Sequence, residues 1–209
     1  MNVEQKDQSF FDQDYFENGV STGKSGYDIG TFDINNSIFC QQAEMLHNIL
    51  KLRGKKVLDI GCARCNLVHH LRDWGIKAYG VDISAWCKWN SHEPVYHILG
   101  DASCEKLITE LDLVVSFESF EHIADIDGLL DNISRHLDAG GLLIFTTPVN
   151  AEAMADHSKD ASSVSLHNRD WWHAMLLAHG FVERKDLFDK FFWYKLRIQY
   201  NWEIFCYEL

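Results

Sequence analysis

The sequence predicts an α/β fold in which helices cover both faces of a mostly parallel, seven-stranded sheet that ends in an antiparallel hairpin. Two observations support this prediction. From about residue 55 onward, short apolar runs alternate with segments of helical periodicity, the order expected for parallel strands joined by right-handed crossovers. At the C-terminal end, two apolar runs follow each other with no helical segment between them, and such a short connection gives an antiparallel pair.

The strands are predicted from runs of apolar and β-branched residues that stop at glycine, proline or acidic residues. The clearest is Leu-Asp-Leu-Val-Val-Ser-Phe at 111–117, whose apolar density is typical of a strand buried on both faces. The last run, 196–206, has an apolar residue at every second position, as in a half-buried strand. In chain order, the predicted strands are residues 56–61, 77–83, 95–99, 111–117, 142–147, 181–187 and 196–206.

The helices are predicted from apolar residues spaced three and four positions apart. The segment after the first strand repeats apolar residues from Leu67 to Trp74 and stops at Gly75. One predicted helix precedes the sheet, and the others follow strands. In chain order, the predicted helices are residues 37–52, 67–74, a short helix beginning at Ser84, 126–137 and 170–179.

The composition limits the classes of partner. The chain has 209 residues, 46% of them apolar, which is enough for one well-buried domain and short for two. Its formal net charge is -12 and no run of Lys or Arg exceeds two residues, so we expect no nucleic-acid partner. No apolar run approaches the ~20 residues that span a bilayer, and the first residues lack the apolar stretch of a signal peptide. We therefore expect a soluble, cytoplasmic protein, a monomer or homodimer, that does not bind membranes.

Residues 57–65, Val-Leu-Asp-Ile-Gly-Cys-Ala-Arg-Cys, allow two interpretations. Cys62 and Cys65 form a C-x-x-C pair between a strand and a helix start, the spacing of a thioredoxin-like redox pair or of half a zinc site. A thioredoxin-like fold is much shorter and needs a proline opposite the cysteines, whereas Pro94 and Pro148 are the only prolines here. No second C-x-x-C and no closely spaced Cys/His pair supplies further zinc ligands. The sequence therefore disfavours both redox and zinc chemistry.

A nucleotide-binding loop explains more of the same stretch. A strand that runs into Gly61 allows a tight backbone turn beside a ligand, and Asp82 lies 21 residues further on, at the end of the second strand. This is close to the ~20-residue separation at which an acidic side chain accepts hydrogen bonds from ribose hydroxyls. Asp101, at the end of the third strand, is placed to bind an adenine amino group. Three successive strand ends thus predict an adenosine site.

The chain also contains five longer segments in a fixed order. They are Val-Leu-Asp-Ile-Gly-Cys-Ala at 57–63, Gly-Val-Asp-Ile-Ser at 80–84, Gly-Asp-Ala at 100–102, Asp-Leu-Val-Val-Ser-Phe-Glu-Ser-Phe-Glu-His-Ile at 112–123, and Leu-Asp-Ala-Gly-Gly-Leu-Leu-Ile-Phe-Thr-Thr-Pro at 137–148. Together they resemble the motifs of class I S-adenosylmethionine-dependent methyltransferases. The resemblance implies a Rossmann-like, doubly wound sheet with an antiparallel C-terminal seventh strand, and a single methyltransferase domain at 37–209. One departure is that the family usually has glycines where Ala63 and Cys65 stand.

The resemblance implies S-adenosylmethionine as the cofactor and indicates the residues that bind it. Asp59 and Gly61 match the first motif, and the strand-end acids match the second and third. The cofactor-binding residues expected in this way are Tyr15, Tyr27, Asp59, Gly61, Cys62, Asp82, Ile83, Asp101, Ala102, Phe117 and Glu118.

Residues 1–36 form a distinct N-terminal segment that is too aromatic for a disordered tail. Its aromatic residues include Phe10, Phe11, Tyr15, Phe16 and Tyr27. One hypothesis is an aromatic lid that places ring faces against the positive sulfonium of the cofactor. The other is ordinary packing of these rings against the edge of the sheet.

Candidate catalytic bases are His122, just past the fourth strand, and His167, in the loop after the fifth, because both positions open onto the crevice. Glu118, Glu121 and His122 also have the spacing to lie on one helical turn and bind a divalent ion, with His167 as a fourth ligand. A Glu-x-x-Glu-His sequence here resembles that of ubiquinone-pathway O-methyltransferases and of small-RNA terminal 2′-O-methyltransferases, in which it binds metal. It is also common in family members without metal, where it forms a turn and a helix start. The sequence leaves both possibilities open.

These features predict a methyltransferase that uses S-adenosylmethionine to methylate an oxygen or nitrogen atom of a small molecule. The first alternative is a metal-assisted O-methyltransferase acting on a 2′-hydroxyl or a vicinal diol. The others are a protein that binds the cofactor without catalysis and an NAD-type oxidoreductase, which would need a G-x-G-x-x-G loop that this sequence lacks.

Overall fold

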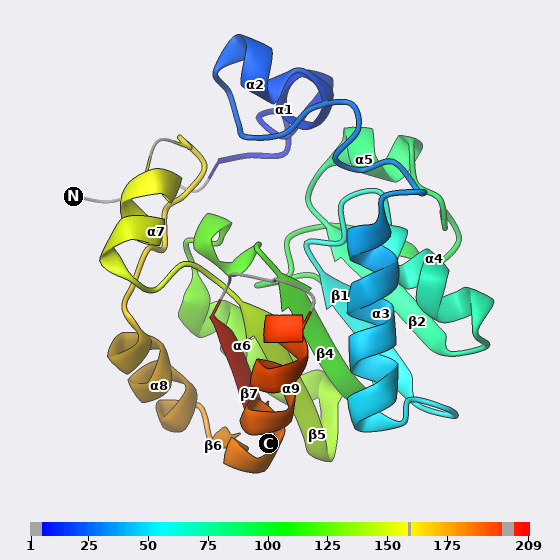
Figure 1. Cartoon of the computed structure of the whole chain (residues 1–209), viewed down its shortest axis with the longest axis vertical. Helices are drawn as coiled ribbons and strands as arrows, with labels where there is room; N and C mark the ends of the chain where they lie inside the picture. The colour runs from blue at the N-terminus through cyan, green and yellow to red at the C-terminus, as the bar shows by residue number, and fades with distance from the viewer. Residues whose placement is uncertain (1–5, 159, 198–202) are drawn as a thin grey trace.

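The centre of the molecule is a seven-stranded mixed sheet with the strand order β3-β2-β1-β4-β5-β7-β6 (Figure 1). The structure is a computed structural model, which describes residues 6–158, 160–197 and 203–209. Strands β1 to β5 run parallel, and β7 runs antiparallel to both of its neighbours, so the predicted fold class is confirmed. The strands are β1 (Lys56–Ile60), β2 (Lys77–Asp82), β3 (His97–Leu99), β4 (Leu111–Phe117), β5 (Leu137–Thr146), β6 (Val182–Glu183) and β7 (Ile204–Glu208).

Two strands differ in length from the prediction. β3 begins at His97 rather than at Val95, whose side chain is 83% exposed and has no place in the buried sheet. β5 begins earlier than expected, because Leu137 pairs with Leu111 before the register shifts and regular pairing resumes at Leu142. The remaining parallel strands match the apolar runs that predicted them.

The prediction for the C-terminal region was wrong in one respect. A helix, α9 (Lys185–Arg197), replaces most of the strand expected at 181–187 and the start of the strand expected at 196–206. Leu187 and Phe191, four residues apart, bury one face of this helix against β7. β6 and β7 still form an antiparallel pair, but a helix connects them instead of a short loop. The middle of the expected strand, 198–202, lies outside the described residues.

Helices cover both faces of the sheet (Figure 1). One face packs against α3 (Ser37–Leu50), α4 (Asn66–Asp73) and α9, with Leu46 and Leu67 in its core. The other face packs against α6 (Ile126–His136) and α8 (Arg169–Ala178), with Trp172 as its largest buried side chain. In the part of the chain that the structure describes, no helix is long and apolar enough to cross a membrane.

Shorter elements gather at the end of the sheet where the parallel strands terminate (Figure 1). Two N-terminal helices lie above this end, and α7 lies beside them. A 3-10 turn follows β4 directly. The elements are α1 (Gln13–Glu17), α2 (Gly19–Thr22), α5 (Ala85–Trp89), the turn η1 (Phe120–His122) and α7 (Ala151–His157). Ligands bind at this end of a doubly wound sheet.

Candidate active site

Two adjoining cavities open at the carboxyl ends of the parallel strands. The larger has a volume of about 830 Å³ and the smaller of about 110 Å³. Both are lined by Tyr27, Gly61, Phe117, Glu118 and His122. The shared walls make them two parts of one site.

The loop between β1 and α4 forms a wall of both cavities. Gly61 has a φ of +71°, and a Cβ at this position would lie 2.0 Å from Oγ of Ser119, so only glycine fits. Ala63 and Cys65 occupy the positions where the family usually has glycine, yet their φ angles are also positive, at 44° and 63°. Each costs about 1 to 2 kcal/mol of backbone strain. The loop thus keeps a glycine-type conformation despite the two departures.

Asp82 holds this loop against β2. Its Oδ2 accepts a hydrogen bond from the backbone amide of Ala63 at 2.8 Å, and its Oδ1 accepts one from the amide of Ser84 at 2.8 Å. Burial raises the pKa of this carboxyl, and the two amide hydrogen bonds partly oppose that rise. Asp82 therefore fixes the loop and also lies on the wall of the smaller cavity.

The smaller cavity lies between the ends of β2 and β3 and the N-terminal segment. Ile83 follows β2 on its wall, and Asp101 and Ala102 follow β3. Aromatic side chains cover it from the opposite side: Phe11, Tyr15 and Phe16, each no more than 7% exposed. The Phe16 ring stacks on Trp86 with centroids 5.6 Å apart. The N-terminal segment thus packs over this cavity.

Two carboxylates and a histidine converge beside the larger cavity, which Glu118 and His157 line. Ligand atoms of Glu118, Glu121 and His157 all lie within 4.8 Å of one another. Glu118 accepts a hydrogen bond from Oγ1 of Thr146 at 2.5 Å, and Glu121 accepts one from Oγ1 of Thr147 at 3.2 Å. The second oxygen of each carboxylate is buried and has no hydrogen-bond partner among the described residues. Burial, followed by repulsion from Glu121, raises the pKa of Glu118 well above its ordinary value.

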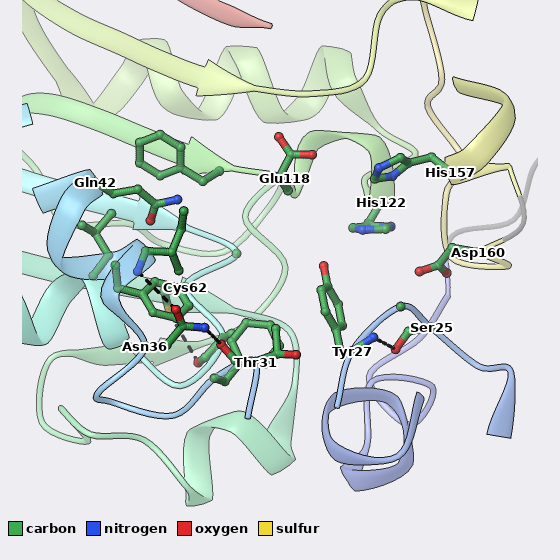
Figure 2. A pocket seen from close by; sticks show the side chains of 18 of the residues that line it. Ser25, Tyr27, Thr31, Asn36, Gln42, Cys62, Glu118, His122, His157 and Asp160 are labelled. Carbon is green, nitrogen blue, oxygen red and sulfur yellow. Dashed lines mark hydrogen bonds between the residues drawn. The ribbon is translucent and has the colours of Figure 1, made fainter. Parts of the chain in front are cut away.

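His122 lies beside this cluster and is tied to the N-terminal segment. Its Nδ1 is 2.9 Å from Oγ of Ser162, which donates to Oδ1 of Asp160 at 2.6 Å. The hydroxyl of Tyr15 lies 3.0 Å from the same Ser162 oxygen and donates to Oδ2 of Asp160 at 3.2 Å. Because Ser162 gives its proton to Asp160, it accepts one from Nδ1 of His122, which leaves Nε2 as the unprotonated nitrogen of the neutral ring. Figure 2 shows His122, His157 and Glu118 on one side of the cavity, with the hydroxyl of Tyr27 pointing toward them.

The predicted site residues fall into two groups. All of the expected cofactor-binding residues line one or both cavities, as does His122. His167 lines neither cavity. Its ring stacks on Trp171 with centroids 3.6 Å apart, and burial lowers its pKa. The place beside the two glutamates that was expected for His167 is occupied by His157.

Three residues near His122 were missed in the sequence: His157, Asp160 and Ser162. They lie at the end of α7 and in the turn after it, in a region without a recognisable motif. Only their position could have indicated them in the sequence. The chain leaves β5 at the same end of the sheet as the motif residues, so the residues that follow it lie near the site. Position alone does not distinguish these residues from their neighbours.

Comparison with known proteins identifies the relatives of this chain. Residues 38–206 match a family model described as a methyltransferase domain. A ubiquinone biosynthesis O-methyltransferase from Nitrobacter winogradskyi is 30% identical over 103 residues, which are 46% of this chain and 40% of that protein. One from Pseudomonas fluorescens is 27% identical over 107 residues, 47% of this chain and 46% of that protein. The chain thus spans less than half the length of these curated relatives.

Solved structures share the fold. A SAM-dependent methyltransferase from Archaeoglobus fulgidus has a TM-score of 0.60 at 15% identity, and the match covers 82% of this chain and 94% of that one. The geranyl diphosphate C-methyltransferase of Streptomyces coelicolor A3(2), solved with Mg²⁺, geranyl diphosphate and S-adenosyl-L-homocysteine, has a TM-score of 0.59 at 15% identity. That match covers 81% of this chain and 78% of the other.

Proposed function

The chain belongs to the class I S-adenosylmethionine-dependent methyltransferases, and on this basis we propose that it methylates an oxygen or nitrogen atom of a small molecule. The observation that carries the proposal is the pair of adjoining cavities. The smaller has strand-end carboxylates suited to an adenosine, and the larger has room for an acceptor and contains a histidine base. The net charge of -12 favours a small molecule over a nucleic acid as acceptor.

In this proposal the smaller cavity holds the adenosine part of the cofactor. The bound cofactor supplies a methyl group activated by a sulfonium. Each carboxylate oxygen of Asp82 accepts one hydrogen bond from a backbone amide and has a second lone pair. These second lone pairs accept hydrogen bonds from the ribose hydroxyls. Asp101 accepts from the adenine amino group, and Gly61 lets the backbone approach closely where a side chain would collide with Ser119.

The N-terminal segment acts as a lid in this proposal. Oγ of Ser84 donates a hydrogen bond to the backbone carbonyl of Phe11 at 2.6 Å, and Phe16 stacks on Trp86. These contacts hold the segment over the smaller cavity while Tyr27 faces both cavities. A closed segment excludes water and presents aromatic rings to a cationic cofactor.

His122 acts as the general base. Its Nε2 is unprotonated when Nδ1 donates to Ser162. It therefore accepts the proton that an acceptor hydroxyl loses as the new bond to carbon forms, or the proton that a neutral amine loses once it has been methylated. Asp160 completes the chain of hydrogen bonds that fixes this tautomer. The enzyme otherwise works by positioning, because the methyl carbon is already activated.

The proposal is tested in two steps. S-adenosylhomocysteine should raise the melting temperature of the protein, whereas nicotinamide nucleotides should not. Radiolabelled S-adenosylmethionine is then offered with a panel of small phenols, catechols, alcohols and amines, and label should appear in at least one class. Stabilisation by nicotinamide nucleotides would contradict the family assignment, and cofactor binding without transfer to any class would favour the non-catalytic alternative.

The glutamate cluster favours a second candidate, a metal-assisted O-methyltransferase. Glu118 and Glu121 each have one buried carboxylate oxygen without a hydrogen-bond partner among the described residues. Nδ1 of His157 lies 3.7 Å from that oxygen of Glu121. Two carboxylates and an imidazole suit Mg²⁺ or Mn²⁺. A bound ion would orient two neighbouring hydroxyls of an acceptor and stabilise the ionised form of one of them. The similarity of part of the chain to ubiquinone biosynthesis O-methyltransferases is consistent with a diol or catechol acceptor.

A chelator separates the two candidates. If metal takes part, treatment with EDTA should abolish transfer to a catechol, and added Mg²⁺ or Mn²⁺ should restore it. Glu121→Gln should raise the metal concentration needed for half activity by at least tenfold, whereas the exposed control Glu152→Gln should not change it. Full activity in EDTA would leave the metal-free mechanism with His122 as base.

A further inference from the structure

A second cluster of potential metal ligands lies under the loop between β1 and α4. The sulfur atoms of Cys62 and Cys65 and a ring nitrogen of His97 all lie within 4.8 Å of one another. The three side chains are buried, with exposed fractions of 6%, 0% and 3%. Methyl transfer as proposed above uses neither these sulfurs nor this imidazole.

Within this cluster, the buried imidazole of His97 has ring nitrogens left unsatisfied by the described residues. His97 is the first residue of β3 and lies opposite Gly80 of β2 in the register of the sheet. Although the side chain is buried, neither ring nitrogen makes a hydrogen bond of regular geometry to any described residue. The ring does interact electrostatically with the sulfur of Cys65. A buried polar group without a partner costs about 1 to 3 kcal/mol. An imidazole buried beside two thiols and left in this state indicates a ligand that completes it.

Gly80 provides the space for the cluster. A Cβ at this position would lie 2.5 Å from Sγ of Cys62 and 2.9 Å from Sγ of Cys65, so both sulfurs lie directly over the backbone of β2. Cys65 is held there by a backbone with a φ of 63°. The missing side chain at Gly80 and the strained loop above it together leave room for two soft sulfur donors and one imidazole.

The distance between the sulfurs favours a metal ion over a disulfide. The two Sγ atoms are 3.4 Å apart, and the thiol of Cys65 donates a hydrogen bond to that of Cys62. Two thiolates on one tetrahedral zinc ion, with Zn–S bonds of about 2.3 Å, are about 3.8 Å apart, whereas a disulfide needs about 2.05 Å. The observed separation is therefore much closer to that of a metal-bound pair.

We propose that Cys62, Cys65 and His97 bind a zinc ion. Two thiolates and one imidazole are a ligand set that zinc prefers. The buried carboxylates of Asp59 and Asp82 interact electrostatically with the two cysteines, so a divalent cation would offset negative charge in this region. Cys62 lines the larger cavity, which gives the ion a route to the cluster. Binding releases the two thiol protons to solvent and links the loop to the start of β3.

The test uses Co²⁺ and Zn²⁺ as probes on reduced, chelator-treated protein. One equivalent of Co²⁺ per chain should produce the intense near-ultraviolet absorption of cobalt–thiolate bonds, and Zn²⁺ should displace it. His97→Gln should weaken Co²⁺ binding by at least tenfold, and Cys65→Ser should reduce the thiolate absorption. The exposed control Cys104→Ser and the surface control His136→Gln should bind as the wild type does. A thermal shift with S-adenosylhomocysteine identifies any variant that fails to fold.

A second measurement needs no variant. Of the six cysteines, Zn²⁺ should protect Cys62 and Cys65 from alkylation in the folded protein, as mapped by mass spectrometry. The proposal is overturned if neither cysteine is protected, if cobalt gives no thiolate absorption, or if His97→Gln binds with unchanged affinity. Glu121→Gln should leave the absorption intact. Co²⁺ binding that Glu121→Gln weakens and Cys65→Ser leaves unchanged would overturn the proposal and assign the metal to the glutamate cluster instead. None of these measurements depends on methyl transfer.

Discussion

The two cavities of the site differ in size, covering and chemistry. The smaller, at about 110 Å³, is roofed by aromatic rings and walled by the ends of β2 and β3. The larger, at about 830 Å³, is also lined by His157 of α7, in addition to Glu118 and His122, which both cavities share and which lie after β4 and in the turn η1. One half of the site is small and has two strand-end carboxylates, and the other is roomy and adds the imidazole of His157. Cofactor affinity and transfer chemistry should therefore respond to different substitutions.

The largest effect is expected in the larger cavity. His122→Asn removes the proposed base, so kcat should fall by about 10²- to 10⁴-fold, while affinity for S-adenosylhomocysteine stays within a few-fold. Steady-state kinetics with the best acceptor of the panel and calorimetry measure the two quantities. His136→Asn, on α6, is the control and should leave both unchanged. An unaltered kcat in His122→Asn would remove this residue from the mechanism.

The next effect belongs to the smaller cavity. Asp82→Ala should weaken S-adenosylhomocysteine binding at least tenfold, about 1.4 kcal/mol, because the ribose and the amides of Ala63 and Ser84 lose their acceptor. Isothermal calorimetry gives the affinity, with the exposed Asp138→Ala as control. Equal affinities in Asp82→Ala and wild type would refute the ribose assignment.

Glu118 lines both cavities. Substituting it is expected to change how the stability of the protein depends on pH. The pKa of Glu118 is raised, first by burial and then by Glu121, so the folded state binds the proton more tightly than the unfolded state does. The free energy of unfolding should therefore fall as the pH rises from the ordinary glutamate pKa of about 4.3 toward the raised value. Glu118→Gln cannot ionise, so its stability relative to wild type should increase over the same range.

Urea unfolding at several pH values checks this dependence, with Glu152→Gln, exposed on α7, as the control. A constant difference between Glu118→Gln and wild type across the range would mean that Glu118 does not titrate there.

The smallest effect on cofactor affinity is expected from the two cysteines of the loop between β1 and α4. Replacing Cys62 and Cys65 together with serine should change S-adenosylhomocysteine affinity by no more than a few-fold in chelator-treated protein. Asp82 and Gly61, rather than the thiols, set the loop conformation. Calorimetry beside Cys104→Ser measures the effect. Loss of binding would show that the cysteine pair contributes to the cofactor site itself.

The sequence predicted the smaller cavity better than the larger, for a physical reason. Asp82 and Asp101 end consecutive strands, so local patterns and the rules of a parallel sheet place them together. His157 reaches the two glutamates, and Ser162 reaches His122, through the folding of a connection after β5 that has no periodicity or motif. His97 likewise joins the cysteines only through the register between β2 and β3.

The C-terminal error has a similar origin. Apolar residues at alternate positions predicted a strand from 196, but α9 runs to Arg197 because Leu187 and Phe191 bury a helical face. A short run of apolar residues can fit both the two-residue period of a strand and the 3.6-residue period of a helix. Tertiary packing then decides which element forms.

The hydroxyl of Ser162 has a consequence for the order of events in a catalytic cycle. It touches Tyr15 of the N-terminal segment on one side and His122 on the other. Any opening of that segment that admits the cofactor removes one of the contacts that orient this hydroxyl. If the segment opens as proposed, the Ser162 hydroxyl keeps its hydrogen bonds to Asp160 and His122 but loses its contact with the Tyr15 hydroxyl. Opening of the proposed lid would therefore change the surroundings of the proposed base as well as the access of water to the site.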